Sequence, residues 1–247
     1  MRLAVAGGTG TVGRLVVEAA RSRGHDVVVL SRAAGVDVTS GSRVDEALAG
    51  VDAVVDVTST ATRSAAASEA FFRSVTTALL DAGQRSGVGH HLVLSIVGAA
   101  QAPHGYYAGK ALQEGLVTGG PVPWTLLRTT QFHEFARQVL GQARIGPVDL
   151  VPVMRSAPVA AAEVADRIVD LLEAGPAGRV RDLAGPEELR MVDMVRAYAR
   201  ATGRHGRVVA VPLPGGFGRA LRDGTVLPGP DTDRGTQTFS TWLDRLG

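Results

Sequence analysis

Cysteine is absent from this 247-residue chain. Its absence excludes disulfides, a thiolate nucleophile and a cysteine-based zinc site. Long apolar runs are missing as well, since no stretch approaches the roughly 18 consecutive apolar residues that spanning a bilayer requires. The first expected strand starts at residue 2, so we expect no signal peptide, no membrane partner and a cytoplasmic location.

Neither sign of charge dominates. The chain has 26 Lys+Arg and 24 Asp+Glu residues, a formal net charge of +2, and its basic residues form no dense run. Nucleic-acid binding needs a basic patch, so a nucleic-acid partner is not expected. The neighbouring histidines His90 and His91 have no further ligands at a metal-binding spacing, and no metal site is expected. A small-molecule substrate is the expected partner, and the chain is expected to be a monomer or a homodimer.

Lysine is nearly absent too: Lys110 is the single lysine among the 26 basic residues, and it lies four positions after Tyr106. On a helix, residues four apart share a face. A lysine ammonium is a compact charge, and a nearby cation favours phenolate, so we expect Lys110 to lower the pKa of Tyr106. Tyr106 would then serve as a general acid or base. The alternative is that Lys110 pairs with Glu114, also at i+4, on a solvated face while Tyr106 only packs.

Four of the chain's 31 glycines, in contrast, are clustered near its start, at 7–13. An apolar strand at 3–6 leads into a G-x-x-G-x-x-G pattern at 7–13, then into a helical apolar stripe and a β-branched strand at 27–30. Glycines in this setting permit a tight turn, a close approach to a pyrophosphate and close helix packing. The pattern predicts a dinucleotide site, with a glycine turn that binds no nucleotide as the alternative. The residues expected to contact the dinucleotide here are Gly7, Thr9, Gly10, Thr11, Val12 and Gly13.

Cofactor choice is expected at the end of the second strand, at Ser31 and Arg32. An acidic residue there would bind the 2′-hydroxyl of NAD, whereas a guanidinium can grip the 2′-phosphate of NADP. The first acid after Arg32 is Asp37, which we place in a third strand, facing the adenine or capping a helix. NADP(H) is therefore expected over NAD(H). Alternatively, Arg32 is an ordinary surface residue.

Short apolar strands continue to alternate with helical stripes along the chain, at 53–57, 91–95, 124–128 and 179–183. This alternation predicts an α/β fold, a Rossmann-type doubly wound parallel sheet with a small C-terminal substrate-side subdomain. The whole chain, 1–247, is expected to form one domain, with a dinucleotide-binding core at about 1–150 and 176–185 and the substrate side at about 186–247. Ligands bind at the carboxyl ends of such strands, which adds Thr58 to the expected cofactor contacts.

These patterns resemble the atypical short-chain dehydrogenase/reductases, in particular their NmrA-like NAD(P)H-binding branch. The resemblance is carried by Ala6 to Gly13, Leu92 to Ser95, Tyr106 to Lys110, and Trp124 to Arg128 leading into Gln131 and Phe132. It implies that Ser95 bonds the substrate carbonyl, Tyr106 passes the proton and Lys110 holds the nicotinamide ribose. Ser95 lies 11 residues before Tyr106, a short spacing for this family, and its alternative role is to satisfy a loop amide.

The resemblance also implies that the segment after Thr129 passes the nicotinamide, which makes Thr130 a cofactor contact. The substrate pocket would then include Gln131, Phe132 and Phe135, and its apolar character suits a quinone, enone or other ketone. We expect an NADPH-dependent oxidoreductase. The alternatives are a non-catalytic NADP(H) sensor, as the NmrA-like branch contains, and a nucleotide-sugar epimerase or dehydratase, which Arg32 and the short C-terminal region disfavour.

Overall fold

The chain divides into two units in the computed structural model, which describes residues 1–246. Unit 1 comprises residues 1–128 and 162–181, and unit 2 the remaining segments, which begin at Thr129 and Asp182. Residues 129–150 therefore group with unit 2 and not with the expected dinucleotide-binding core. The last residue of the expected domain, Gly247, lies outside the described residues.

Strand β1 lies inside the sheet of unit 1, between β3 and β2, and every residue from Leu3 to Ala6 is fully buried. The strand order is β5-β4-β3-β1-β2, and the pairs β1–β2, β1–β3 and β3–β4 are parallel. A short strand, β9, pairs in parallel with β5. The strands are β1 (Arg2–Ala6), β2 (Asp26–Leu30), β3 (Ala53–Asp56), β4 (His90–Ile96), β5 (Trp124–Thr129) and β9 (Gly178–Arg179).

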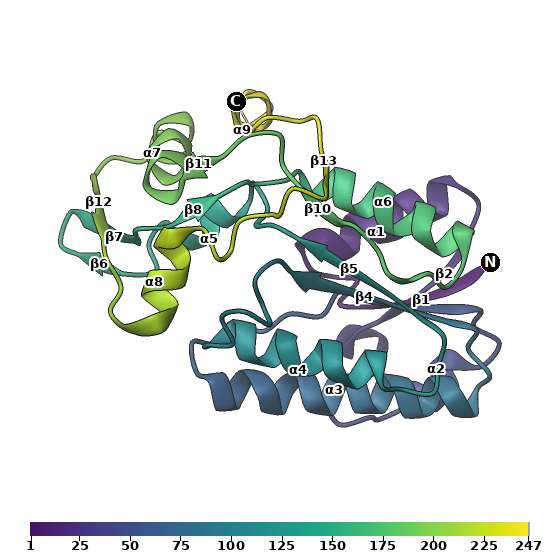
Figure 1. Ribbon diagram of the computed structural model, residues 1–247. Helices are drawn as coiled ribbons and strands as arrows, with labels where there is room; N and C mark the ends of the chain where they lie inside the picture. The colour runs from purple at the N-terminus through teal and green to yellow at the C-terminus, as the bar shows by residue number, and fades with distance from the viewer. Residues whose placement is uncertain (247) are drawn as a thin grey trace. The chain divides into compact units, whose positions relative to one another are not determined.

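Helices cover both faces of this sheet, with α1 and α6 on one side and α2, α3 and α4 on the other (Figure 1). Their bounds are α1 (Thr11–Ser22), the 3₁₀ helix η1 (Arg32–Ala34), α2 (Val44–Leu48), α3 (Ala65–Arg85), α4 (Tyr106–Thr118) and α6 (Ala161–Ala174). Apolar side chains of β1 and β3 pack against α2 and α3, with Ala4, Val54, Leu48 and Leu79 in one buried cluster. The expected doubly wound parallel sheet is confirmed.

Helices α3 and α4 approach each other at Gly109. A Cβ atom built at Gly109 would lie 2.2 Å from Ser68 Oγ and 2.6 Å from Phe72 Cδ2, so only glycine fits between the helices. The Ser68 hydroxyl donates a hydrogen bond of 3.0 Å to the carbonyl of Tyr106. This contact places Ser68 and Phe72 on the buried face of α3.

Unit 2 has shorter elements. Its strands form the pairs β11–β8 and β10–β13 and the three-stranded order β12-β7-β6. They are β6 (Arg144–Ile145), β7 (Val148–Pro152), β8 (Arg155–Ser156), β10 (Asp182–Ala184), β11 (Leu189–Arg190), β12 (Arg207–Val211) and β13 (Thr232–Arg234). The helices are α5 (Phe135–Val139), α7 (Met191–Ala201), α8 (Gly215–Asp223) and α9 (Phe239–Leu243).

Two expected strands differ from those observed. The strand predicted at 179–183 is divided into β9, which pairs with β5, and β10, which pairs with β13 and, through Leu183 and Thr129, also with β5. Asp37 does not lie in a third strand but forms an isolated bridge with Ser42. Within residues 1–246, none of the helices combines the length and the apolar character that crossing a membrane demands.

Candidate functional site

The glycine turn between β1 and α1 lies against the carboxyl end of β3. Gly7 has φ +82°, and a Cβ atom there would lie 2.8 Å from the carbonyl oxygen of Val57. At Gly13 a Cβ atom would lie 2.1 Å from the Gly7 carbonyl oxygen, which itself accepts a 2.9 Å hydrogen bond from the amide of Gly10. The turn is therefore closed by backbone contacts that only glycine at these two positions permits.

The amino end of α1 is open to an anion. Its N-cap, Gly10, provides no side-chain hydrogen bond, and the first helical turn carries no acidic residue. The first amides of a helix have no partner within the helix, and the helix dipole makes this end positive. A dinucleotide pyrophosphate fits such a turn. The predicted residues from Gly7 to Gly13 are thus brought together at one place, and their contact with a cofactor stays a prediction.

At the end of β2, Ser31 caps the short helix η1, where its hydroxyl accepts a 3.3 Å hydrogen bond from the amide of Ala34. Arg32 is exposed, and within residues 1–246 no hydrogen bond or ion pair holds its guanidinium. Asp37 binds its own loop, because its carboxylate accepts a 2.9 Å hydrogen bond from the amide of Thr39, which lowers the carboxyl pKa. Arg32 is therefore available to an anion, while Asp37 stabilises a turn.

Lys110 lies buried at the carboxyl ends of β3 and β4, with an exposed fraction of 4 %. Its Nζ donates to the carbonyl oxygens of Thr58 at 3.3 Å and Leu94 at 2.9 Å, and to Gln113 Oε1 at 2.8 Å. The same nitrogen stands 4.4 Å from the centre of the Phe72 ring, a cation–π distance. Burial lowers the pKa of Lys110 to about 8, against the opposing effect of nearby carboxylates. The ammonium is thus fixed by three acceptors and remains charged at neutral pH.

Tyr106 does not have the expected lowered pKa. Burial raises its pKa to about 12, although a 3.3 Å hydrogen bond donated by the Ser59 hydroxyl acts in the opposite direction. Tyr106 and Lys110 do lie on the same helix, at i and i+4, as predicted. The prediction of an acidified phenol is wrong because the Lys110 ammonium donates its hydrogen bonds to other acceptors and burial dominates at Tyr106.

Two residues that the sequence motifs did not indicate, Asp56 and Gln113, complete this network. Asp56 is fully buried at the end of β3, and it accepts hydrogen bonds from the amide and hydroxyl of Thr58 at 3.0 and 2.6 Å. Its other oxygen accepts from Gln113 Nε2 at 2.8 Å, so a carboxylate, an amide and the Lys110 ammonium form a continuous chain. An acidic residue directly after the apolar run 53–55 was the available signal. The strand expected at 53–57 includes Asp56 as an ordinary strand residue, with no role in the site.

Ser95 takes part in a different interaction from the one expected. Its hydroxyl donates a 2.6 Å hydrogen bond to Glu114 Oε1, and Glu114 is bound by two nitrogens of Arg128. All three side chains are buried. In this arrangement the Ser95 hydroxyl has no hydrogen left for a substrate carbonyl. The alternative pairing of Lys110 with Glu114 on a solvated face is also wrong, because Arg128 is the partner and the face is buried.

The segment predicted to line the substrate pocket belongs to unit 2. Thr130 donates its hydroxyl to the carbonyl of Ala157, and Gln131 Oε1 accepts a 2.6 Å hydrogen bond from the Ser156 hydroxyl. Phe132 forms a bridge with Val159, and Phe135 begins α5; both rings are only partly buried. The side chains of Thr130 and Gln131 thus form hydrogen bonds within unit 2, whereas the rings of Phe132 and Phe135 retain accessible surface. Their part in a substrate pocket stays a prediction.

Comparison with protein families gives one match that covers most of the chain. A family model described as NAD(P)H-binding matches residues 7–174, from the glycine turn to the end of α6. A curated relative, the photosystem II assembly factor Ycf39 of Synechocystis, is 26% identical over 238 residues, which cover 86% of this chain and 71% of that protein.

Solved structures resemble the chain along its whole length. A UDP-glucose 4-epimerase from Bifidobacterium longum, in complex with NAD⁺ and UDP, has a TM-score of 0.73 at 14% identity, covering 98% of this chain and 96% of that one. A new type of NADPH-dependent quinone oxidoreductase from Escherichia coli has a TM-score of 0.67 at 18% identity, covering 99% of both chains. At these identities the likeness establishes the fold alone, which is the Rossmann-type α/β fold that the sequence predicts.

Proposed function

Because the chain belongs to the NAD(P)H-binding family, we propose that it is an NADPH-dependent oxidoreductase that reduces a carbonyl, enone or quinone of a small apolar substrate. The observation that carries the proposal is the buried Lys110 ammonium, held by Thr58 and Leu94 at the carboxyl ends of two parallel strands. Ligands of this kind of sheet bind at that edge. Tyr106 begins the same helix one turn earlier.

The residues of this site divide into three roles. The open amino end of α1 and the glycine turn would hold the pyrophosphate, and Lys110 would hold the ribose next to the nicotinamide. Bound NADPH would supply the hydride. Tyr106, whose pKa of about 12 keeps its hydroxyl protonated at neutral pH, would donate the proton to the substrate oxygen, because an alkoxide is a stronger base than a phenolate. The Ser59 hydroxyl, which is exposed and bonded to Tyr106, would connect that phenol with solvent.

Arg32 supports NADP(H) over NAD(H). Its guanidinium is exposed at the end of β2, and the nearest following acid, Asp37, is engaged in its own loop. A guanidinium binds a phosphate through two charge-assisted hydrogen bonds. The proposed substrate class rests on Phe132 and Phe135, whose partly buried rings would favour an apolar ketone or quinone over a sugar phosphate.

Replacement of Tyr106 by phenylalanine tests the proposal. The matched control is Tyr107→Phe, the same chemical change one position along α4, at a side chain that is 6 % exposed. We expect Tyr106→Phe to lower turnover of a quinone and carbonyl panel by about 10²- to 10⁴-fold, the usual contribution of a positioned acid or base. NADPH affinity, measured by fluorescence titration, should stay within about two-fold, since the phenol is assigned to the substrate oxygen.

A second candidate is a regulator that binds NADP(H) without turning it over. It is favoured by the engagement of the Ser95 hydroxyl with Glu114, and by the similarity to an assembly factor. The same experiment separates the two. If the wild type binds NADPH but reduces nothing in the panel, and Tyr106→Phe changes neither property, the regulator is the correct assignment. A larger thermal shift with NADH than with NADPH would contradict the role of Arg32.

A further inference from the structure

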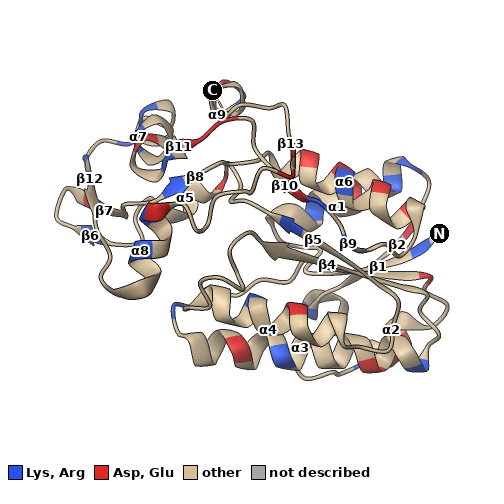
Figure 2. Cartoon of the chain, in the orientation of Figure 1, with Lys and Arg blue, Asp and Glu red and all other residues tan. Residues whose placement is uncertain are grey.

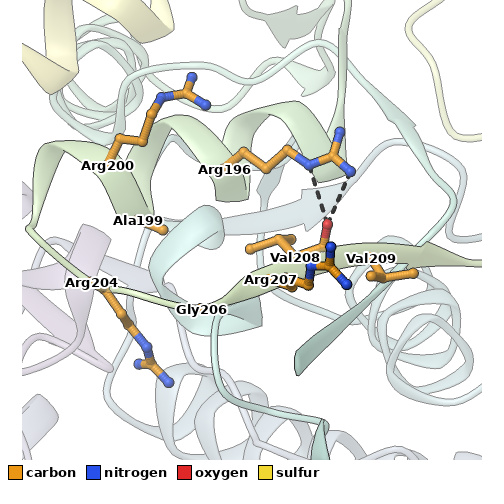
Figure 3. A pocket seen from close by; sticks show the side chains of 8 residues that line it. All are labelled: Arg196, Ala199, Arg200, Arg204, Gly206, Arg207, Val208 and Val209. Carbon is orange, nitrogen blue, oxygen red and sulfur yellow. Dashed lines mark hydrogen bonds between the residues drawn. The ribbon is translucent and has the colours of Figure 1, made fainter. Parts of the chain in front are cut away.

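A cavity in unit 2 is lined by four arginines. It has a volume of about 420 Å³ and lies between α7 and the first residues of β12, and its charged lining is Arg196, Arg200, Arg204 and Arg207. Its remaining surface is small or apolar, with Ala199, Gly206, Val208 and Val209. Among the residues that the structure describes, no acidic side chain lines it. Figure 3 shows the arginines leaving three consecutive segments: the helix, the loop after it and the start of the strand.

Local geometry explains why these residues border one cavity. Arg196 and Arg200 are four apart on α7 and therefore share a face, while Ala199 is buried beneath them. In β12 the side chains alternate, so that Val208 is buried and Arg207 is exposed. Between the two elements, Gly206 has φ +147°, and a Cβ atom there would lie 2.9 Å from the carbonyl oxygen of Pro147. Glycine at this position lets the loop turn tightly from helix to strand.

The positive charge of this cavity is only partly neutralised. Arg196 donates to the Val208 carbonyl at 3.0 and 3.2 Å, and its guanidinium lies 3.4 Å from Asp193. Arg204 lies 3.6 Å from the buried Asp149. Arg200 and Arg207 have neither a hydrogen bond nor an ion pair from their guanidinium groups to any residue from 1 to 246. Two of the four cations therefore have no counter-charge, and Figure 2 shows the basic segments of α7 and of the start of β12.

A second cavity of the same unit shows the contrast. Its volume is about 340 Å³, and three arginines line it together with Glu188. There the carboxylate of Glu188 accepts two hydrogen bonds from Arg155, at 2.6 and 3.1 Å, and Arg222 donates to the Leu213 carbonyl at 2.8 Å. The cations of that cavity are used to hold the fold. In the first cavity, Arg200 and Arg207 are left for a ligand.

We propose that the cavity between α7 and β12 is a binding site for a phosphorylated small molecule. A phosphoryl group carries close to two negative charges at neutral pH and three acceptor oxygens, which matches the two unpaired guanidiniums. Each guanidinium can bind it in a bidentate manner. The volume lies in the usual range for a small ligand, and Val208, Val209 and Ala199 would contact its apolar part. The site is distinct from the proposed cofactor site, which is built from unit 1.

Calorimetric titration of the full chain with inorganic phosphate and with pyrophosphate tests this site. Single Arg200→Gln and Arg207→Gln variants should each weaken binding by about ten-fold, and the double variant by about one hundred-fold, as expected for charge-assisted hydrogen bonds. The matched control is Arg73→Gln, which removes an arginine that is also exposed, from α3 of unit 1, and should bind as the wild type does. Titrations are repeated with NADP⁺ present, because the glycine turn can itself bind pyrophosphate.

The outcomes separate this site from the proposed function. Loss of phosphate binding in the double variant, with NADPH affinity and turnover unchanged, supports the proposal even if the protein proves to be no reductase. Equal affinity in all variants overturns it, as does equal binding of acetate and phosphate, since only a general cationic surface would then remain. Binding of single-stranded RNA or of anionic phospholipid vesicles that is tighter than that of pyrophosphate, and lost in the same double variant, would show a macromolecular ligand and also overturn the proposal.

Discussion

Alanine at Gly109 should destabilise the protein, although alanine is the better helix former. A Cβ atom at this position would lie 2.2 Å from Ser68 Oγ, and also 2.6 Å from both Phe72 Cδ2 and the Ser68 carbonyl oxygen. One of these contacts is backbone, so a side-chain rotation alone cannot relieve the overlap. Helix α3 must move away from α4, and Phe72, over which the Lys110 ammonium stands, must move with it.

The expected magnitude follows from two opposing effects. Glycine to alanine in a helix interior stabilises by about 1 kcal/mol. Overpacking a dense interface costs about 1–3 kcal/mol, and the backbone contact places Gly109 near the upper end. The net loss should be roughly 2 kcal/mol, equivalent to about 4–8 °C in the melting temperature of a chain of this size. The matched control is Gly115→Ala in the same helix, where a Cβ atom meets nothing within 4 Å. That variant should gain roughly 1 kcal/mol, or about 2–4 °C.

Thermal and urea unfolding of the three proteins measure both effects. The two alanine variants should fall on opposite sides of the wild type, about 3 kcal/mol apart. If Gly109→Ala were as stable as Gly115→Ala, the close approach of α3 and α4 would be refuted. The placement of Lys110 beside Phe72 would then lose its support as well.

Three further predictions follow from the buried charges and the open arginine. Burial lowers the pKa of His90 to about 4 in the folded protein, whereas histidine in the unfolded chain has its usual pKa of about 6.5. As the pH falls, the unfolded chain therefore binds a proton at His90 before the folded protein does. Stability should therefore fall by about 2 kcal/mol between pH 7 and pH 5, and His90→Gln should abolish that part of the loss in urea unfolding; identical pH dependence in both proteins would contradict it. Arg128→Met leaves the Glu114 carboxylate buried without its partner and should cost roughly 3–5 kcal/mol, whereas Glu114→Leu combined with Arg128→Met should recover most of it. A single variant as stable as the wild type would refute this estimate. Arg32→Asp should weaken NADPH binding by about 10- to 100-fold and leave NADH binding equal or stronger, as measured by competing fluorescence titrations; unchanged preference would remove Arg32 from cofactor choice.

The architecture of unit 1 could be predicted because its signals are local. An apolar run at 3–6, a glycine turn and a helical stripe each specify their own element, and the structure contains all three. The predictions that were wrong concern elements whose structure depends on contacts with residues distant in sequence. The strand predicted at 179–183 is divided, because β9 pairs with β5, whereas β10 pairs with both β5 and β13. The face of α3 that is buried depends on Gly109, about forty residues away, which no periodicity within α3 reveals.

The hydrogen-bond partners of the site residues were harder to predict from the sequence than the positions of these residues on helices and strands. The i, i+4 spacing correctly places Tyr106 and Lys110 on one helix, but spacing alone does not choose between the acceptors that surround an ammonium. Glu114 was available at i+4 from Lys110, and Arg128, on a separate strand, binds it instead. A bidentate guanidinium–carboxylate pair matches two donors to two acceptors, which a lysine cannot do. The choice depends on β5, whose position relative to α4 is a tertiary property.

The single lysine of the chain is consequently at the predicted place, but for a different physical reason. An ammonium has three donors, and at Lys110 two backbone carbonyls and one amide oxygen accept them within a fully enclosed space. A guanidinium has five donors in a rigid plane, so in this space at least two of them would be left without an acceptor, at a cost of about 1–3 kcal/mol each. Arginine, which provides every other basic side chain counted among the 26 Lys+Arg residues, is therefore excluded at position 110 by its number of donors and by its shape. This requirement for lysine is structural and does not depend on catalysis, because the hydrogen bonds of Lys110 hold the ends of β3 and β4 together. All three donors of the Lys110 ammonium are therefore already used when no ligand is bound. To hold a ribose, the ammonium must exchange one of its carbonyl acceptors for a ribose hydroxyl, and ligand binding has to drive this exchange.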